Sequence, residues 1–329
     1  MKKKALITGI FGQDGSYLCE LLTSLNYEVH GVIRSELSEN SIKIQKHLAL
    51  NNVNPILHNV DLNDYDKLKE LFVNVRPDEI YHLAAFHVSS QGVDGNKDLY
   101  EKQLFDYNVK STSNILSIAW QYLKQTKIIT AGSCLMFDDS ETNQQDENTP
   151  FNSNSLYGLA KITENSLVKY YRNKGLFCAT AILYNHESSR RSDNFVTKKI
   201  VKNMIAIKKG EINKFTLGNL SAQKDWGYAK DYSYGMYLMA QAESPEDFVL
   251  SSNHLNTIED FVVICADVLG IVNWKECIEI DQSIIDRKIK TTLFGNSQKA
   301  KIKLKWENSL SLEELIKLMI KNELEDNLL

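Results

Sequence analysis

The chain has 329 residues, of which 43% are hydrophobic and 24% charged, and its 38 basic and 42 acidic side chains give a formal net charge of −4. This composition excludes a disordered chain, a collagen-like repeat and a small disulfide scaffold, and the length suits about two domains or one large α/β unit. The mild acidity offers no broad basic surface, so we expect neither nucleic acid nor a membrane as a partner.

The N-terminal segment does not have the features of a signal peptide, because its apolar run is short and no cleavage pattern follows. No stretch approaches the ~18 consecutive apolar residues of a membrane-spanning helix, so we expect a cytoplasmic protein. The cysteines are scattered, without a C-x-x-C pair, at Cys19, Cys134, Cys178, Cys265 and Cys277. We therefore expect reduced thiols and no metal site.

Strand-like and helix-like segments alternate over the first half of the chain. Short apolar runs predict strands at 4–8, 27–33, 54–59, 79–83, 127–131 and 177–183. Helical patterns fill the gaps, for example at 65–74 and 108–123. This alternation indicates βαβ crossovers and therefore an α/β fold with a doubly wound parallel sheet of Rossmann type.

The rhythm loosens after about residue 185, where polar helices are predicted at 196–209 and 310–322. Because no linker rich in Gly, Ser or Pro interrupts the chain, we expect a smaller C-terminal lobe packed onto the first. The predicted division is a dinucleotide-binding domain over 1–185 and a mainly substrate-binding lobe over 186–329. A segment at about 217–240 is expected to return to the first domain.

A glycine-rich turn, Gly9-Ile-Phe-Gly12-Gln-Asp-Gly15, lies between the first strand and the first helix. In this place the pyrophosphate of a dinucleotide meets backbone N–H groups and the positive end of the helix. Gly9 permits a sharp turn, Gly12 a close approach of the phosphate, and Gly15 tight packing of helix on strand. The residues expected to contact the cofactor here are Gly9, Phe11, Gly12, Gln13, Asp14 and Gly15.

The G-x-x-G-x-x-G spacing resembles that of extended short-chain dehydrogenases/reductases, which mostly act on nucleotide sugars. Tyr157-Gly-Leu-Ala-Lys161 supplies their Tyr-x-x-x-Lys pair, and Ser133 lies upstream at the end of a predicted strand. The resemblance also implies that two further segments contact the cofactor: the one that touches the adenine and the strand end that flanks the cofactor. These further contacts are Asp61, Leu62, Leu83, Ala84, Ala85 and Asn108, in addition to Tyr157 and Lys161.

The residue types in this set suit the oxidation of an alcohol. Tyr157 and Lys161 are four residues apart on a predicted helix and therefore share one face. Lys161 and the oxidised nicotinamide are expected to lower the pKa of Tyr157 from about 10, so that the phenolate can act as a base. Ser133 is expected to hydrogen-bond the substrate hydroxyl and orient it.

The choice of nicotinamide cofactor depends on the end of the second strand. NAD enzymes usually place an acidic residue there, whereas Arg34 would suit the 2′-phosphate of NADP. Arg34 is followed by Ser35 and Glu36, where NADP-using relatives have a second arginine. We therefore expect NAD and leave NADP open.

The second half of the chain resembles GDP-mannose 4,6-dehydratases, and the match runs from residue 4 to about 306. The matching strings are LYNHESSRR at 183–191, FVTKKI at 195–200, GNL at 218–220, DWGYAKDY at 225–232 and PEDFV at 245–249. This resemblance implies substrate contacts at Asn185, Glu187, Arg191, Val196, Lys199, Lys224 and Arg287. We expect His87 as a further sugar contact. Basic side chains suit phosphate oxygens, and we expect Arg190, Arg191, Lys199, Lys224 and Arg287 to cluster around the diphosphate.

One departure from that family concerns the chemistry. In the dehydratases a Glu lies 22 residues before the catalytic Tyr and removes the C5 proton, and here this position is Leu135. An aliphatic side chain cannot take a proton. Strand alternation would point the neighbouring Cys134 away from Leu135, and Asp138 and Asp139 are expected in a polar loop.

We therefore expect a GDP-sugar C4 dehydrogenase whose substrate is of the GDP-mannose or GDP-manno-heptose type; the sequence is similar to enzymes that oxidise GDP-manno-heptose for surface polysaccharides. The alternatives are a 4,6-dehydratase with its acid/base moved, for example to His87, a 4-epimerase, and a non-catalytic nucleotide-sugar-binding regulator. Family resemblance also implies a homodimer or homotetramer that pairs through helices at about 108–123 and 156–171.

Overall fold

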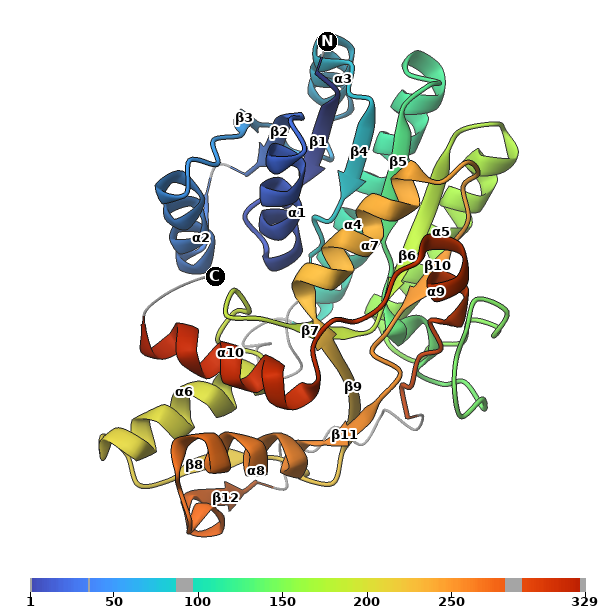
Figure 1. Cartoon of the computed structure of the whole chain (residues 1–329). Helices are drawn as coiled ribbons and strands as arrows, with labels where there is room; N and C mark the ends of the chain where they lie inside the picture. Colours follow the sequence, from blue (N-terminus) through green and yellow to red (C-terminus); the bar gives the residue numbers. More distant parts are fainter. Residues whose placement is uncertain (1, 35, 87–96, 282–291, 326–329) are drawn as a thin grey trace.

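The computed structural model describes residues 2–34, 36–86, 97–281 and 292–325. Its centre is a sheet of seven parallel strands in the order β10-β6-β5-β4-β1-β2-β3 (Figure 1). These strands are β1 (Lys4–Thr8), β2 (Glu28–Ile33), β3 (Ile56–Asn59), β4 (Glu79–His82), β5 (Lys127–Ala131), β6 (Cys178–Leu183) and β10 (Phe248–Leu250). The order from β3 to β6 is that of a doubly wound Rossmann sheet, which confirms the predicted fold class.

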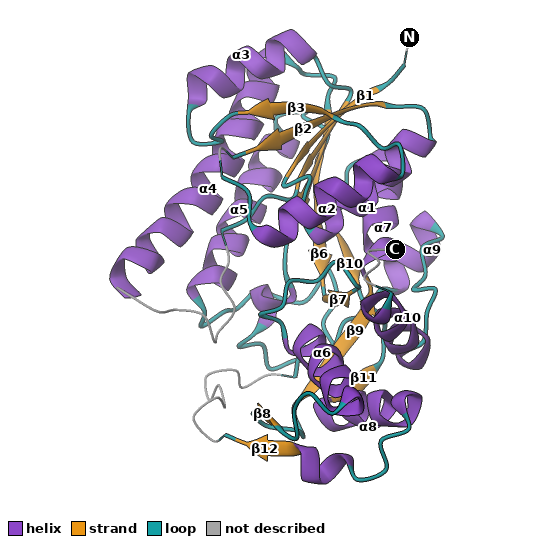
Figure 2. Ribbon diagram, turned by 90° about the vertical axis from the view of Figure 1, so that its left-hand side faces the viewer, coloured by secondary structure: helices purple, strands orange, loops and turns teal. Residues whose placement is uncertain are grey.

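Helices cover both faces of this sheet, which explains why β4 and β6 are buried along their whole length (Figure 2). One face carries α3 (Tyr65–Val75), α4 (Lys97–Tyr122) and α5 (Leu156–Asn173). The other carries α1 (Gln13–Ser24), α2 (Glu39–Leu50), α7 (Ala229–Gln241) and α9 (Gln298–Leu304). Helix α4 begins at Lys97, well before the predicted 108.

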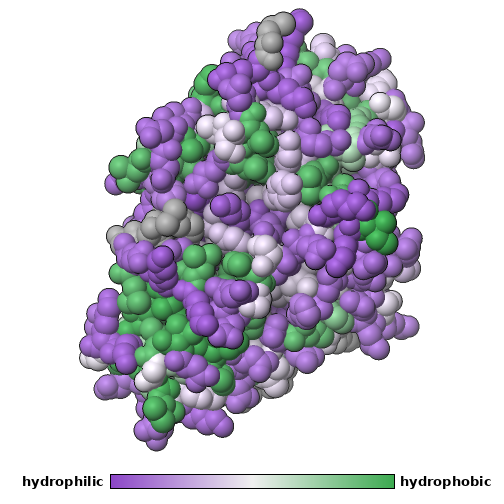
Figure 3. Space-filling view, in the orientation of Figure 1, coloured by the Kyte–Doolittle hydropathy of each residue, from purple (hydrophilic) through white to green (hydrophobic). Residues whose placement is uncertain are grey.

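A smaller lobe lies below the sheet in Figure 1 and has its own apolar core. It contains α6 (Val196–Lys209), α8 (Ile258–Leu269), η2 (Trp274–Cys277) and α10 (Leu312–Leu324). Its short strands are β7 (Asn185–Glu187), β8 (Phe215–Leu217), β9 (Gln223–Tyr228), β11 (Leu255–Thr257) and β12 (Ile278–Ile280), paired as β11-β9-β7 and β12-β8. On the face that Figure 3 shows, apolar residues gather over this lobe, whereas the surface over the large sheet is mainly hydrophilic.

Only the second half of the segment expected at 217–240 returns to the large sheet, as helix α7. Strand β9 pairs within the smaller lobe, and only from α7 onward does the chain pack against α1 and β5. Strand β10 then adds the seventh strand beside β6. The division at residue 185 remains a prediction.

The five cysteines are free thiols, four of them buried. Across the described ranges, no helix combines the length and the apolar character that crossing a bilayer requires. Nor do three or more His, Cys, Asp or Glu side chains within these ranges gather as a metal-binding group would.

Candidate active site

The glycine turn joins β1 to α1 by a very close approach of backbone to backbone. Gly9 has φ +72°, and a Cβ there would lie 2.9 Å from the Ala84 nitrogen. A Cβ on Gly15 would lie 2.3 Å from the Gly9 carbonyl oxygen, so both positions require glycine. Gly12 is the N-cap of α1, and no side chain caps this helix. The first turn of α1 therefore keeps its N–H groups and its positive end for an anion.

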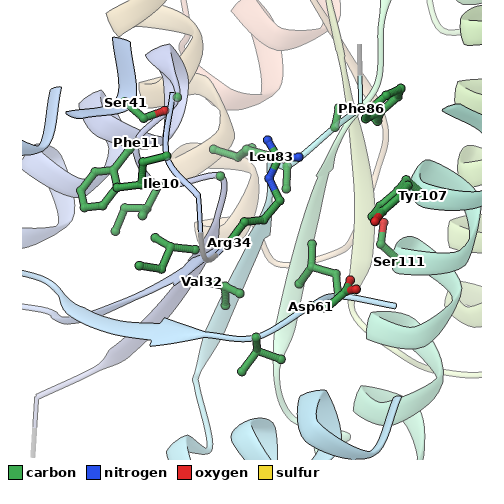
Figure 4. Close-up of a pocket in the computed structure, with 18 of the residues that line it drawn as sticks. Ile10, Phe11, Val32, Arg34, Ser41, Asp61, Leu83, Phe86, Tyr107 and Ser111 are labelled. Atoms are coloured by element: carbon green, nitrogen blue, oxygen red, sulfur yellow. The ribbon is translucent and has the colours of Figure 1, made fainter. Parts of the chain in front are cut away.

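A cavity opens beside this turn, at the carboxyl ends of β1, β2, β3 and β4 (Figure 4). Ten of the residues predicted to contact the cofactor line it, namely Gly9, Phe11, Gly12, Arg34, Asp61, Leu62, Leu83, Ala84, Ala85 and Asn108. The lining also includes residues that were not predicted as cofactor contacts, namely Ile10, Val32, Ile33, Glu36, Leu37, Ser38, Ser41, Val60, Phe86, Tyr107 and Ser111. Most of them adjoin predicted residues at the same strand ends.

The end of β2 places Arg34 and Glu36 on the wall of the same cavity, and Figure 4 shows Arg34 reaching into it. On another wall, the amide of Asn108 accepts from the Phe86 nitrogen at 2.7 Å and donates to the Phe86 carbonyl oxygen at 3.0 Å. Asn108 therefore fixes the chain where it leaves β4. The carboxylate of Glu36 lies where a second arginine would be needed to bind a 2′-phosphate.

Gln13 and Asp14 do not line the cavity, because their side chains connect α1 to β7 and the segment after it. The Gln13 amide donates to the His186 carbonyl oxygen at 3.0 Å and accepts from the Ser188 hydroxyl at 2.8 Å. Asp14 lies 3.0 Å from the His186 ring. Burial opposes the charge on Asp14, but His186 outweighs it and lowers the pKa of this carboxyl. Only the backbone N–H groups of Gln13 and Asp14 can serve an anion in this arrangement.

The predicted catalytic residues meet where η1 (Cys134–Phe137) packs against the start of α5. Ser133 is the N-cap of η1, and its hydroxyl accepts from the Leu135 nitrogen at 3.2 Å. A Cβ on Gly158 would lie 2.3 Å from the Leu135 carbonyl oxygen, so the residue after Tyr157 must be glycine for the two elements to approach. This close approach brings Tyr157 to the Ser133–Leu135 turn.

Lys161 lies beneath Tyr157 in a buried environment. Its Nζ is 5.7 Å from the centre of the Tyr157 ring and 3.1 Å from Oε2 of Glu164, one turn further along α5. Burial raises the pKa of Tyr157, against the opposing effect of Lys161. Lys161 therefore acts in the predicted direction, but burial outweighs it, and the lowering expected with a bound nicotinamide stays a prediction. The sequence analysis also missed Glu164, although its i,i+3 spacing from Lys161 was visible.

The predicted substrate residues on β7 and after it form a connected group. Glu187 is buried, accepts from the Thr197 hydroxyl at 2.5 Å and lies 3.2 Å from Nε of Arg191. The Arg191 guanidinium stacks 3.5 Å above the Phe195 ring. The Asn185 amide nitrogen is buried without a hydrogen-bond partner, as expected of a donor that serves a ligand.

The remaining predicted substrate residues are less closely connected. Val196 and Lys199 lie half-buried in the first turn of α6, and Lys224 lies half-buried in β9. Lys224 is close enough to Cys134 to act on the pKa of that thiol, so it lies near η1. His87 and Arg287 lie outside the described residues.

The expectation that Arg190 joins a diphosphate cluster is wrong. Its side chain is 1% exposed and stacks 3.8 Å above the Tyr17 ring. The guanidinium donates to Glu20 at 2.6 Å and to Ser16 at 3.0 Å, both on α1. A buried arginine held by a carboxylate in this way ties the segment after β7 to α1.

Among the described residues of the turn that carries Leu135, no side chain is available as a base in place of the dehydratase glutamate. A helical turn, not a strand, begins at Cys134, so strand alternation does not apply there. Cys134 is buried, and burial raises the pKa of its thiol to about 12. Asp138 is also buried and accepts from the Asn154 nitrogen at 2.7 Å.

A Rossmann sheet, a glycine turn and a Ser–Tyr–Lys set at the end of β5 together define the class of extended short-chain dehydrogenases/reductases. Solved structures agree with this fold. UDP-glucose 4-epimerase from Thermotoga maritima, solved with UDP-glucose, superposes with a TM-score of 0.83 at 19% identity, covering 98% of this chain and 99% of that one. The dTDP-glucose 4,6-dehydratase of Bacillus anthracis, solved with NAD, gives 0.81 at 18% identity, covering 98% and 97%.

The chain belongs to the GDP-mannose 4,6-dehydratase family, whose model matches residues 6–319. GDP-mannose 4,6 dehydratase 2 of Arabidopsis thaliana is 39% identical over 98% of this chain and 87% of its own length. The GDP-mannose 4,6-dehydratase of Vibrio cholerae is 33% identical over 98% and 94%. The resemblance seen in the sequence is therefore confirmed, and the protein is an enzyme of this nucleotide-sugar family.

Proposed function

We propose that this enzyme oxidises C4 of a GDP-linked sugar, of the GDP-mannose or GDP-manno-heptose type, to a 4-keto sugar without eliminating water. One observation carries the proposal: Ser133, Tyr157 and Lys161 are all present beside Leu135, which replaces the glutamate of the dehydratases. Its relatives' names support a GDP-sugar substrate.

The cavity at the carboxyl ends of the strands suits a nicotinamide dinucleotide. The uncapped start of α1 would hold the pyrophosphate, and Asp61 and Leu62 would lie at the adenine. Glu36, next to Arg34 on the cavity wall, favours NAD over NADP, and related folds have been solved with NAD. When bound, the oxidised cofactor supplies the acceptor for a hydride.

The residues of this chain manage the proton and the orientation. Ser133 hydrogen-bonds the C4 hydroxyl, and the Tyr157 phenolate takes its proton as the hydride leaves C4. Lys161 stabilises the phenolate by its charge. We propose that Asn185, Arg191, Lys199 and Lys224 bind the sugar and diphosphate, with Arg287 added from the family resemblance and His87 as a further sugar contact.

The reaction stops at the ketone because the described residues around Leu135 supply no base for C5. Elimination requires a group that removes the C5 proton and assists the departure of the C6 hydroxyl. Leu135 has no titratable atom, Cys134 remains a protonated thiol and Asp138 is already engaged. A pure dehydrogenase releases a reduced cofactor and therefore depends on another ketone to reoxidise it.

The test is a single-turnover reaction of the NAD⁺-loaded enzyme with GDP-mannose and, separately, GDP-manno-heptose. We expect cofactor reduction and a product that has lost two hydrogens. Loss of water without net cofactor reduction would instead identify a 4,6-dehydratase, the activity that the family's name favours. Inversion at C4 would identify an epimerase, and binding without chemistry a regulator.

A further inference from the structure

A chain of buried hydrogen bonds runs from the end of β1 to the catalytic lysine. The Thr8 hydroxyl is 2.8 Å from Nδ1 of His82, whose Nε2 is 3.1 Å from the Thr112 hydroxyl. Thr112 donates to Oε2 of Glu164 at 3.0 Å, and the same oxygen accepts from Lys161 at 3.1 Å. All five side chains are buried, and they come from β1, β4, α4 and α5.

The direction of each hydrogen bond in this chain follows from its first member. The Thr8 oxygen accepts from the Leu83 and Ala84 nitrogens, both at 3.1 Å, so its hydrogen is donated to Nδ1 of His82. Burial lowers the pKa of His82 to about 3, which keeps the ring neutral with its hydrogen on Nε2. The ring then donates to Thr112, the nearer of two hydroxyls at Nε2, with that of Ser111 at 3.3 Å. Thr112 donates to Glu164, so the main line of donors leads to one carboxylate oxygen.

The five members of this chain are buried, and it ends at a threonine oxygen that already accepts two backbone N–H groups. Its effect is to hold a negative charge 3.1 Å from the Lys161 ammonium group. The Leu83 and Ala84 nitrogens at the far end belong to residues that line the cofactor cavity.

We propose that Glu164 is a positioning residue, which fixes the Lys161 ammonium group and, by its negative charge, keeps Tyr157 a protonated phenol until the cofactor binds. This role rests on the proposed function, in which Tyr157 is the base. Thr112 and His82 orient Glu164. An oxidised nicotinamide would add positive charge beside the ring, so the base would form mainly in the loaded enzyme.

The charges around Tyr157 come from several elements. Lys161 and Glu164 lie on α5, the neutral His82 on β4, the thiol of Cys134 on η1, and Arg191 after β7. Burial raises the pKa of Tyr157, Lys161 and Arg191 oppose this, and Glu164 adds to it. Burial also raises the pKa of the Glu164 carboxyl, whose Oε1 has no hydrogen-bond partner. Replacing Glu164 with a neutral residue should therefore ease the ionisation of Tyr157.

The test is an NMR titration of the full chain labelled with ¹³C at the tyrosine ring carbon that bears oxygen, with and without NAD⁺. Tyr157→Phe identifies the Tyr157 signal. We expect the Tyr157 midpoint to move to lower pH in Glu164→Gln, and the shift that NAD⁺ causes to become smaller. An unchanged midpoint in Glu164→Gln would overturn the proposal, whatever substrate the enzyme proves to use.

Two further variants separate positioning from general damage. Asn165→Ala changes the residue after Glu164 on α5. Asn165 is also buried, but it hydrogen-bonds Asp247 and not Lys161. The titration midpoint of Tyr157 in this variant should therefore match that of the wild type. Thr112→Val should lower kcat several-fold at unchanged KM, and Thr112→Ser should restore it. The proposed role of the hydrogen-bonded residues would be contradicted if the Tyr157 midpoint shifted in Asn165→Ala as in Glu164→Gln. It would also be contradicted if Thr112→Ser did not restore kcat.

Discussion

At the scale of single residues, Leu135 marks the difference between this chain and a dehydratase. Leu135→Glu restores a carboxyl group on η1, where it would lie beside Ser133 and Tyr157. We expect this variant to release some dehydrated product from a GDP-sugar, measured by mass spectrometry. Leu135→Gln has the same size without a base and serves as the control. If Leu135→Glu binds substrate normally but eliminates no water, Leu135 is not the controlling residue.

Tyr157 determines the pH dependence of the oxidation. Burial raises its pKa and the active form is the phenolate, so the rate should rise with pH and fall as acidification protonates the ring. Tyr157→Phe removes the base and should reduce kcat by about 10²–10⁴-fold. NAD⁺ binding, followed by protein fluorescence, should change little. A variant that keeps its rate, or a rate that falls as pH rises toward 9, would contradict this role.

Site residues that belong to a sequence motif with fixed spacing could be predicted from the sequence. Residues whose position depends on contacts distant in the sequence could not. Tyr157 and Lys161 share a helical face, and this face is visible from their spacing alone. The buried pairing of Arg190 with Glu20 was invisible, because 170 positions separate the two residues. Glu164 was missed because its burial and its hydrogen bond with Thr112 of α4 depend on tertiary packing, although its spacing from Lys161 is local.

At the scale of elements, the contact between α1 and the glycine turn is the most sensitive to side-chain volume. Gly15→Ala places a methyl group 2.3 Å from the Gly9 carbonyl oxygen, so the helix must shift. We expect a loss of about 1–3 kcal/mol in unfolding free energy and weaker NAD⁺ binding, measured by denaturation and titration. Ser24→Ala, at the exposed end of the same helix, should change neither. Unchanged NAD⁺ affinity in Gly15→Ala would show that the turn does not hold the cofactor.

Long buried strands and amphipathic helices were predictable, because their periodicity extends over many residues. Strands β7 and β10 have three residues each, too few to show a period, and they exist only through pairing with β9 and β6. The same limit applies to η1, where one helical turn follows a strand and removes the basis for the inference about Cys134.

At the scale of the whole molecule, α4 and α5 present exposed aromatic and aliphatic side chains beside each other. Phe105 and Tyr122 on α4, and Leu159 and Tyr170 on α5, are each more than a third exposed. We expect two copies of the chain to pair through these helices. Tyr170→Glu should yield a monomer in sedimentation analysis, whereas Tyr234→Glu on α7 should not. A Tyr170→Glu variant that sediments as the wild type would exclude this interface.

The large sheet and the smaller lobe each contribute residues to the proposed chemistry, which is oxidation at C4 without proton removal at C5. The direct measurement is the incubation of the NAD⁺-loaded enzyme with GDP-mannose or GDP-manno-heptose in D₂O, followed by mass and NMR analysis of the sugar. We expect a 4-keto product that has lost two hydrogens, with no enzyme-dependent deuterium at C5. Loss of water with deuterium at C5 would contradict it.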